Sequence, residues 1–423
     1  MAVLLENEYG WVLDHKKCID RQYIGTTDKA TVLTAGQKEA VYNIVEEMSM
    51  NLGTMNFELK RDLFAVNRPF LMDSQFQAET MRNEHGERRR ERKRKRKSAL
   101  SVGEQQARVY HDLVKDKIHA AYVELKTIFQ PEDPHQPNLS NNAEARKAAM
   151  ILGPGDSLTE LCEMGGIPQT GDRNGIQLVG GMSISEPSDV LNQPLFYDGA
   201  TPTVVSLLGE RYLLPAHCSF LLSDITHVQL LTRQCNNQYN LIVLDPPWEN
   251  KSVKRLKKYQ QLNNSDLINI PIPKLATAGC LLVVWVTNKE HHRSFVKDEL
   301  FPAWNTEVLA EWHWLKVTNN GETVYDFEST HKKPYETLIL GRFSCEGGQE
   351  RHYPSVPDWR LLISVPCSLH SKKPPLIDVL KRYLPEKPKC LELFARNLME
   401  GWTSWGNEVL KHQHLDYYQK EGT

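Results

Sequence analysis

The sequence lacks several features that would place it in other classes of protein. It has eight cysteines among 423 residues but no Cys-x-x-Cys pair, which argues against a zinc knuckle or a disulfide framework. Residues 1–12 show no basic segment followed by an apolar core, so no secretory signal peptide is expected there. The longest strongly apolar run, residues 280–286, is too short to cross a bilayer. We expect a soluble intracellular protein whose cysteines are buried thiols.

Net charge is also nearly absent. The formal charge is −2, with 25% charged and 40% hydrophobic residues, which is typical of a globular protein. Any affinity for nucleic acid would therefore have to come from local basic clusters, such as the run at residues 87–97. That run is typical of nuclear localisation signals and of segments that contact phosphate, and the alternative is a solvated face at the start of a helix.

The most informative motif is Asp245-Pro246-Pro247-Trp248, which follows the apolar run 241–244. The exocyclic amine of adenine is a poor nucleophile, so a catalyst must accept its hydrogen bonds and hold it in line with an electrophilic methyl group. Asp245 and the Pro246 carbonyl can accept, Pro247 stiffens the turn, and Trp248 offers a face for stacking. The motif therefore predicts methyl transfer to adenine N6. The alternative is an ordinary strand end with a Pro-Pro turn and a core tryptophan.

The length allows two or three domains, and we predict an α/β fold. Residues 1–100 form an N-terminal region with the basic run, and residues 101–208 form a partly helical middle region with a helix over 110–128. From residue 209 to 423, short β-rich runs alternate with helical segments at 262–270, 291–300 and 375–383. The expected strands are 212–214, 241–244, 281–286, 308–317, 337–342, 362–365, 389–393 and 402–405. No Gly-x-Gly-x-x-Gly loop follows an early strand.

Five boxes between about Arg211 and Tyr417 resemble the adenine-N6 methyltransferase family that includes the subunits of the messenger-RNA adenosine methyltransferase. They are residues 222–225 (Leu-Ser-Asp-Ile), 245–255 (the Asp-Pro-Pro-Trp box and its basic continuation), 331–336, 371–375, and 392–397 together with 401–408. The resemblance implies a permuted Rossmann-like, S-adenosylmethionine-dependent methyltransferase domain, in which the catalytic strand precedes the cofactor strand. A smaller, mostly helical N-terminal and middle region would precede it.

The resemblance also implies which residues contact S-adenosylmethionine. Asp224 and the Ile225 backbone match the contact to its adenine, Lys373 matches the residue that binds the tail carboxylate, and Asp245 is shared between the tail ammonium and the target amine. In the last box, Asn407 and Glu408 would bond the ribose. The matches in this box are Glu392, Phe394, Arg396, Asn397, Asn407 and Glu408. The sequence departs from the messenger-RNA enzyme here: the stretch between Arg396 and Gly406 is shorter, and the histidine that precedes the matching asparagine in that enzyme is absent before Asn397. A salt-bridged strand end with a turn asparagine is the alternative for Glu392, Arg396 and Asn407.

The segment after Trp248 predicts the nucleic-acid contact. Basic groups beside an aromatic ring suit single-stranded nucleic acid, since they supply charge for phosphate and a face for a base. By resemblance Tyr259 covers the target adenosine, Glu336 lies near the base, and Lys333 adds positive charge; a solvated basic loop is the alternative. The basic residues of the segment are Lys251, Lys254, Arg255, Lys257 and Lys258. No metal is expected, because the pairs His291-His292 and His217-Cys218 have no further ligand at useful spacing.

These observations and the resemblance together predict an N6-adenine methyltransferase that acts on RNA in the nucleus, with the cytoplasm as a second location. The resemblance further suggests 2′-O-methyladenosine in small nuclear RNA as the target, and the enzyme is expected to act as a monomer. DNA adenine is the alternative substrate. A catalytically silent RNA-binding scaffold is the alternative from another class.

Overall fold

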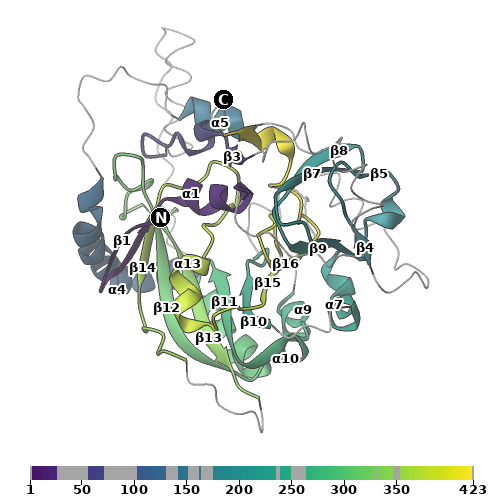
Figure 1. Cartoon of the computed structure of the whole chain (residues 1–423). Coiled ribbons are helices and arrows are strands. Elements are labelled where there is room, and N and C mark those ends of the chain that lie inside the picture. The colour runs from purple at the N-terminus through teal and green to yellow at the C-terminus, as the bar shows by residue number, and fades with distance from the viewer. Residues whose placement is uncertain are drawn as a thin grey trace, which may run out of the picture.

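The computed structural model describes residues 2–25, 56–70, 102–129, 142–150, 162, 175–234, 239–248, 263–329, 332–345 and 353–421. Within them one large sheet of 12 strands runs through the molecule (Figure 1). In spatial order its strands are β1 (Val3–Asn7), β2 (Gly10–Leu13), β14 (Leu361–Ser364), β12 (Thr306–Lys316), β13 (Tyr335–Phe343), β11 (Ala276–Val286), β10 (Tyr239–Leu244), β15 (Cys390–Leu393), β16 (Trp402–Gly406), β9 (Cys218–Leu222), β6 (Pro194–Tyr197) and β4 (Ile176–Gln177).

The centre of this sheet is parallel. β10 pairs in parallel with β11 and β15, and β15, β16 and β9 continue in the same direction. The carboxyl ends of these strands therefore share one edge, which is where open α/β sheets bind their ligands. β10 precedes β15 in the chain and lies directly beside it.

Both faces of the central strands are covered, which explains their continuous apolar runs. Ile242 and Leu244 of β10 point into a core that includes residues of α9 (Asn264–Ile268), α10 (Ile272–Leu275) and the helix Phe295–Leu300. Leu241 and Val243 point to the other face, against α13 (Ile377–Leu380) and the N-terminal hairpin. This alternation follows from the period of two in a strand. The prediction of an α/β fold is therefore confirmed.

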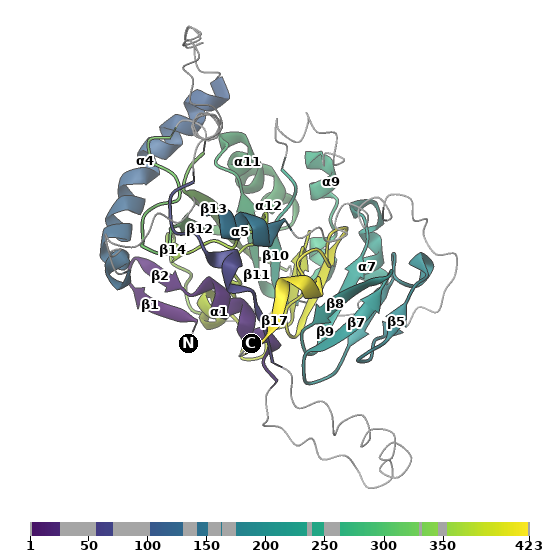
Figure 2. The ribbon, with the colours of Figure 1, turned by 90° about the horizontal axis from the view of Figure 1, so that it is seen from above.

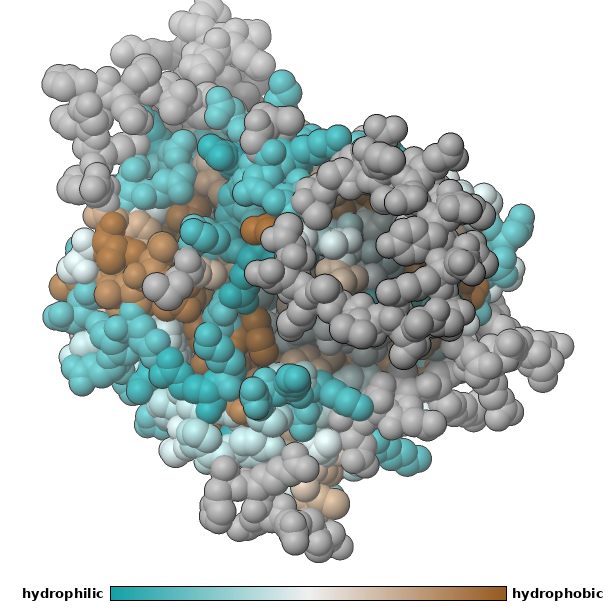
Figure 3. Space-filling model, viewed as in Figure 1, coloured by the Kyte–Doolittle hydropathy of each residue, from teal (hydrophilic) through white to brown (hydrophobic). Residues whose placement is uncertain are grey.

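The helix predicted over 110–128 is present as α4 (Val102–Leu125), and the α-helical part ends at Leu125. Ile118, Ala121 and Leu125 are buried against β14 and β2, as the helical spacing predicts, whereas Ile128 is partly exposed. Figure 2 shows α4 along the side of the sheet formed by β1 and β2. Figure 3 shows hydrophobic surface on this side, and β1 and α4 carry the exposed apolar residues Leu4, Val109 and Leu113.

All eight predicted strands are present, with ends shifted by a few residues. The predicted helical segments correspond to α9, to α11 (Glu290–Ser294) with the helix that follows it, and to α13 with a 3-10 turn at Lys381–Tyr383.

The expectation of a mostly helical region before residue 209 is not confirmed, because the described residues there form both helices and strands. The helices are α1 (His15–Asp20), α4 and α5 (Ala143–Ala149), and the strands are β1, β2, β3 (Phe57–Leu59), β4, β5 (Ser183–Ile184), β6 and β7 (Thr203–Leu207). β7 (Thr203–Leu207) pairs with β8 (Glu210–Leu214) through Leu208 and Gly209, which both have positive φ. Two such residues form the tight turn of a hairpin. The predicted division at 208/209 falls inside this turn.

The remaining strands are short. β5 (Ser183–Ile184) joins β7 and β8 in a separate three-stranded sheet, and β17 (Tyr418–Lys420) pairs with β3. None of the described helices is long and apolar enough to span a membrane.

Candidate active site

The predicted catalytic motif lies at the carboxyl edge of the parallel strands. β10 ends at Leu244, and the backbone N–H of Asp245 donates to the Leu393 carbonyl of β15, at 3.4 Å. The Trp248 N–H donates to the Pro246 carbonyl at 2.8 Å, which folds the two prolines into a tight turn. The motif therefore leaves the sheet at once and presents Asp245 and Trp248 on different sides of the turn.

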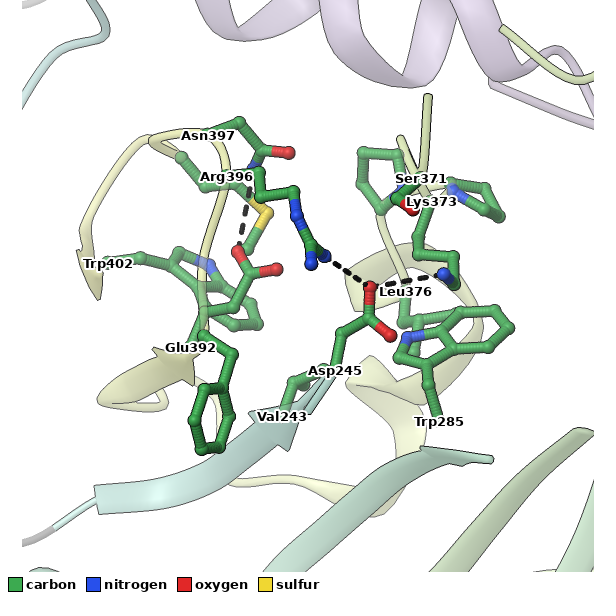
Figure 4. A pocket seen from close by; sticks show the side chains of 14 residues that line it. Val243, Asp245, Trp285, Ser371, Lys373, Leu376, Glu392, Arg396, Asn397 and Trp402 are labelled. Atoms are coloured by element: carbon green, nitrogen blue, oxygen red, sulfur yellow. Dashed lines mark hydrogen bonds and ion pairs between the residues drawn. The ribbon is translucent and has the colours of Figure 1, made fainter. Parts of the chain in front are cut away.

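Asp245 is bound by two cations through a single carboxylate oxygen. Its Oδ2 accepts from Lys373 Nζ at 3.1 Å and from Arg396 Nη1 at 3.0 Å (Figure 4). Among the described residues none bonds the second oxygen, Oδ1. The charge of Asp245 is therefore balanced through Oδ2, while Oδ1 remains able to accept from a ligand.

These three groups belong to a longer row of alternating charges across the sheet edge. Lys373 also contacts Glu336 at 3.2 Å, and Arg396 Nε contacts Glu408 at 2.9 Å. Burial alone would raise the pKa of Glu336, but the adjacent lysines lower it to about 2. The row reads Lys316, Glu336, Lys373, Asp245, Arg396, Glu408 and Lys411. Each carboxylate in it therefore has a cation on both sides, which fixes the position of Asp245.

Glu392 lies outside this row and has a different electrostatic environment. Burial and the nearby Asp245 carboxylate raise its pKa from 4.5 to about 7, against the opposing effect of Lys372, Arg396 and Lys373. Its Oε2 accepts from Asn397 Nδ2 at 3.4 Å (Figure 4). Glu392 therefore holds its proton more readily than an ordinary carboxyl group does, and it lies next to the ion-paired Asp245.

Asp245 and Glu392 both line a cavity that gathers six of the predicted cofactor residues, from β10, β15 and the loop before α13 (Figure 4). Phe394 and Ser371 in its wall have φ of 60° and 62°, values that non-glycine residues rarely adopt and that concentrate at functional sites. The predicted residues that line it are Asp245, Lys373, Glu392, Phe394, Arg396 and Asn397. The sequence did not single out Val243, Trp285, Ser371, Pro374, Pro375, Leu376, Met399 or Trp402, although 371–375 was one of the recognised boxes.

The other predicted cofactor residues follow the next strands of the same edge. Asp224 and Ile225 come after β9, and Asn407 and Glu408 come after β16, which pairs with β9. The Ser223 N–H donates to the Gly406 carbonyl at 3.4 Å, so the two turns are joined. None of the four lines the cavity of Asp245, but Glu408 is connected to it through Arg396.

A second cavity begins on the other side of the prolines. Its described lining is aromatic, amide and apolar, and includes Trp248 and the imidazoles of α11: Pro246, Pro247, Trp248, Asn263, Asn264, Leu267, His291 and His292. The sequence reasoning considered the two histidines only as metal ligands. His292 and Trp248 are separated by 43 residues in the sequence, so no local pattern predicted that they are in contact.

Three contacts fix the Trp248 ring. Its Nε1 donates to the Trp285 carbonyl at 2.7 Å, its face stacks on His292 at 4.7 Å with an interplanar angle of 26°, and Phe295 meets it edge-on. Burial, with smaller effects of His291 and Lys289, lowers the pKa of His292 to about 3. His292 Nδ1 lies 2.6 Å from Thr287 Oγ1. The tryptophan therefore rests on a neutral, hydrogen-bonded imidazole.

The predicted nucleic-acid residues are only partly described. Lys251, Lys254, Arg255, Lys257, Lys258 and Tyr259 lie outside the described residues. Lys333 donates to the Phe327 carbonyl at 3.0 Å, and burial lowers its pKa. It lines neither cavity, whereas Glu336 borders the first through Lys373. No cluster of three metal-ligating His, Cys, Asp or Glu side chains occurs in the described part of the chain.

Comparison with known proteins adds to this geometry. Residues 239–408 match the MT-A70 family. The chain is 40% identical to the human N(6)-adenine-specific methyltransferase METTL4 over 86% of its own length and 81% of that protein. It is 49% identical to METTL4 of Mus musculus over 62% of its length, and there it spans only 57% of the relative.

Two further relatives differ in the nucleic acid that their names specify. One is a DNA N6-methyl methyltransferase of Caenorhabditis elegans, 31% identical over 85% of this chain and 93% of that protein. The other is the N6-methyladenosine RNA methyltransferase MTA1 of Pyricularia oryzae, 37% identical over 51% of this chain and 59% of that protein.

The mostly parallel sheet with a cavity at its carboxyl edge, taken with the family match, fits the class of Rossmann-like methyltransferases. The chain belongs to the MT-A70 family and within it is similar to METTL4. The predictions of the family and of an N6-adenine methyltransferase are confirmed.

Proposed function

We propose that this enzyme transfers the methyl group of S-adenosylmethionine to N6 of adenosine in RNA. The observation that carries the proposal is the position of Asp245. Its carboxylate lies in the ionic cavity, and the three residues that follow it line the aromatic cavity. One rigid turn therefore separates a site suited to a charged donor from a site suited to a flat base.

The donor set of the first cavity fits the cofactor's amino-acid tail. Carboxylates of Asp245 and Glu392 suit an ammonium group, and Lys373 suits a carboxylate. S-adenosylmethionine, when bound, supplies an electrophilic methyl group. Both oxygens of Glu408 already accept from cations, Oε2 from Arg396 and Oε1 from Lys411. We therefore assign Asn407 to the ribose and Glu408 to holding Arg396.

The adenine of the cofactor would lie at Asp224 and Ile225, beyond Asn407 along the same edge. In this arrangement β15 is the cofactor strand, and β10, which carries Asp245, precedes it in the chain. The proposal thus includes the permuted strand order that the resemblance implied.

The target amine needs two acceptors because it carries two hydrogens. Asp245 Oδ1 is one, and the Pro246 carbonyl is the other, since a carbonyl that accepts from the Trp248 N–H keeps a second lone pair. Holding both N–H groups would direct the nitrogen lone pair toward the methyl group. The N–C bond would form as the bond between the methyl carbon and the sulfonium sulfur breaks, and the proton that the nitrogen loses would pass to the Asp245 carboxylate, which accepts its hydrogen bond. The fixed turn supplies this orientation before the substrate arrives.

A target base must leave its stack to reach the second cavity, so a loop or single strand is the expected substrate. Trp248, which is fixed by His292 and Trp285, would stack on it. The basic residues 251–258, Tyr259 and Lys333 would guide the strand. The basic run at residues 87–97 supports a nuclear location for the enzyme. We propose 2′-O-methyladenosine of small nuclear RNA as its target. We also propose that the monomer is the active form.

DNA is the second candidate, and the worm relative's name favours it. The test compares methylation of matched single-stranded oligonucleotides that carry one adenosine, 2′-O-methyladenosine or deoxyadenosine. We expect the 2′-O-methylated substrate to react fastest. A preference for deoxyadenosine would show that DNA, and not RNA, is the substrate. If calorimetry detected no heat when S-adenosylmethionine is added, the protein would instead be a catalytically silent scaffold.

A further inference from the structure

Asn192 is a buried residue of the region before residue 209, to which the sequence analysis assigned no function. It lies after the 3-10 turn Pro187–Asp189, is only 1% exposed, and has φ of 59°. Asparagine tolerates this left-handed conformation better than most residues do, because its short side chain hydrogen-bonds locally. The position therefore restricts the residue type on conformational grounds alone.

The backbone N–H and the side-chain Oδ1 of Asn192 both contact residues at the end of β9. Its backbone N–H donates to the Leu222 carbonyl at 3.0 Å, and its Oδ1 accepts from Ser223 Oγ at 2.8 Å. His227 Nδ1 lies 3.1 Å from the same Oδ1. Asn192 thus bonds to residues on both sides of Asp224 and Ile225.

The two sides of this contact are themselves fixed. Val190 and Leu191 are buried in a hydrophobic core, and the Leu191 N–H donates to the Pro187 carbonyl at 2.9 Å. Ser223, which is fully buried, donates its N–H to the Gly406 carbonyl, immediately before Asn407. A continuous hydrogen-bonded path therefore runs from Asn192 through Ser223 to both turns that the proposed function assigns to the nucleoside of the cofactor.

We propose that Asn192 is a positioning residue that fixes the turn at residues 223–225 for the adenine end of the cofactor. This inference rests on the proposed function, because it needs the cofactor's nucleoside at that turn. The region before residue 209 would then contribute to cofactor affinity without touching the reacting atoms.

The test uses three variants that separate the backbone from the side chain. Asn192→Gly relieves the positive φ but removes Oδ1, Asn192→Ala removes Oδ1 and keeps the conformational cost, and Asn192→Asp keeps an acceptor. We expect Asn192→Gly and Asn192→Ala to weaken S-adenosylmethionine binding by about 3- to 10-fold, the effect of one or two lost hydrogen bonds. Asn192→Asp should stay within about twofold of the wild type.

Asn142 provides the matched control. It also has a positive φ of 53°, is 8% exposed, and accepts through Oδ1 from the Asn67 and Arg68 N–H groups. Asn142→Gly should lower the melting temperature comparably but leave cofactor affinity unchanged. Adenosine alone, used as a competitor, should lose affinity for Asn192→Gly by the same factor as S-adenosylmethionine, since the defect lies at the nucleoside end.

Unchanged cofactor affinity in Asn192→Gly, or an equal loss in Asn142→Gly, would overturn the inference while the proposed function stands. A wild-type protein that does not bind S-adenosylmethionine would overturn both.

Discussion

The two cavities on either side of the Pro246-Pro247 turn differ in the kind of side chain that lines them. The ionic cavity, which we propose as the cofactor cavity, contains Asp245, Lys373, Glu392 and Arg396. The described lining of the aromatic cavity has no Asp, Glu, Lys or Arg. His292, whose pKa is about 3, stays neutral there. The difference matches the two reactants, because the donor is a zwitterion with a cationic sulfur and the target base is uncharged.

This contrast has a consequence for how each site is held. Asp245, Lys373 and Arg396 in the cofactor cavity are each held by two partners of opposite charge, at distances near 3 Å. Trp248 in the aromatic cavity is fixed by stacking and a single hydrogen bond. Substitutions should therefore separate into those that affect the cofactor and those that affect the target.

The largest effect is expected where the two cavities meet. Asp245→Ala removes the acceptor of the target amine and releases Lys373 and Arg396. Losing one preorganised acceptor costs on the order of 10² to 10³ in rate. Single-turnover methylation, with melting curves to show that the fold is intact, measures this loss.

Asp245→Asn is the control for Asp245→Ala, since it keeps the shape and one acceptor but not the charge. It should lose cofactor affinity in addition to rate. If the Asp245→Ala variant were folded and kept near-normal turnover, Asp245 would have no role in methyl transfer.

The next largest effect concerns the cofactor cavity alone. Lys373→Ala removes the proposed partner of the tail carboxylate, and a lost charge-assisted hydrogen bond costs about 1.5 to 3 kcal/mol, or roughly 10- to 100-fold in affinity. Asn407→Ala should act in the same direction through the ribose, by a smaller factor. Calorimetry with S-adenosylmethionine measures both, and RNA affinity should not change.

Lys387, exposed just before β15 and thus at the opposite end of that strand, is the control lysine. Lys387→Ala should leave cofactor affinity as it is. If Lys373→Ala instead weakened RNA binding and spared the cofactor, the two sites would have to be exchanged.

A smaller effect is expected at His292. His292→Ala removes the support of Trp248, and an aromatic pair contributes about 0.5 to 1.5 kcal/mol, or roughly 2- to 10-fold. kcat/KM for the oligonucleotide should fall by this factor, while cofactor affinity remains constant. His292→Phe, which restores a stacking ring without the bond to Thr287, should recover most of the loss, and no recovery would argue against stacking.

The last effect is on stability rather than on activity, and it depends on pH. The pKa of Glu392 is about 7 in the folded protein and 4.5 for a free carboxyl group, so the folded state binds more protons between these values. The free energy of unfolding contributed by this group therefore falls as pH rises from about 4.5 to 7. The Glu392→Gln variant lacks this pH-dependent contribution to the free energy of unfolding, because its amide does not ionise.

The stability of Glu392→Gln relative to the wild type should consequently rise between pH 5 and pH 8 in urea melts. A difference that stays constant over this range would show that Glu392 ionises normally.

The family resemblance pointed to six residues that line one cavity, and the sheet explains why some of them lie together. Asp245 and Glu392 belong to apolar runs that pair in parallel, so their side chains must meet at one edge. The same reasoning recovered the strands themselves, since buried parallel strands have continuous apolar sequences.

What the sequence did not reveal depends on contacts between distant segments. The stacking of His292 on Trp248 and the bond from Ser223 to Asn192 join residues through the packing of α11 and of the loop before β6. No local pattern encodes such pairs. The hairpin of β7 and β8 was missed because Leu208, at its turn, adopts a positive φ that leucine seldom takes.

The most direct test of two chemically distinct sites is a crossed pair of titrations. Lys373→Ala and Trp248→Ala are each titrated with S-adenosylmethionine by calorimetry and with a single-stranded adenosine oligonucleotide by fluorescence anisotropy. The division of the site predicts that Lys373→Ala loses affinity only for the cofactor and that Trp248→Ala loses affinity only for the oligonucleotide, by about 1 to 3 kcal/mol. Loss of both affinities in both variants would contradict it, because the two cavities would then form a single binding site.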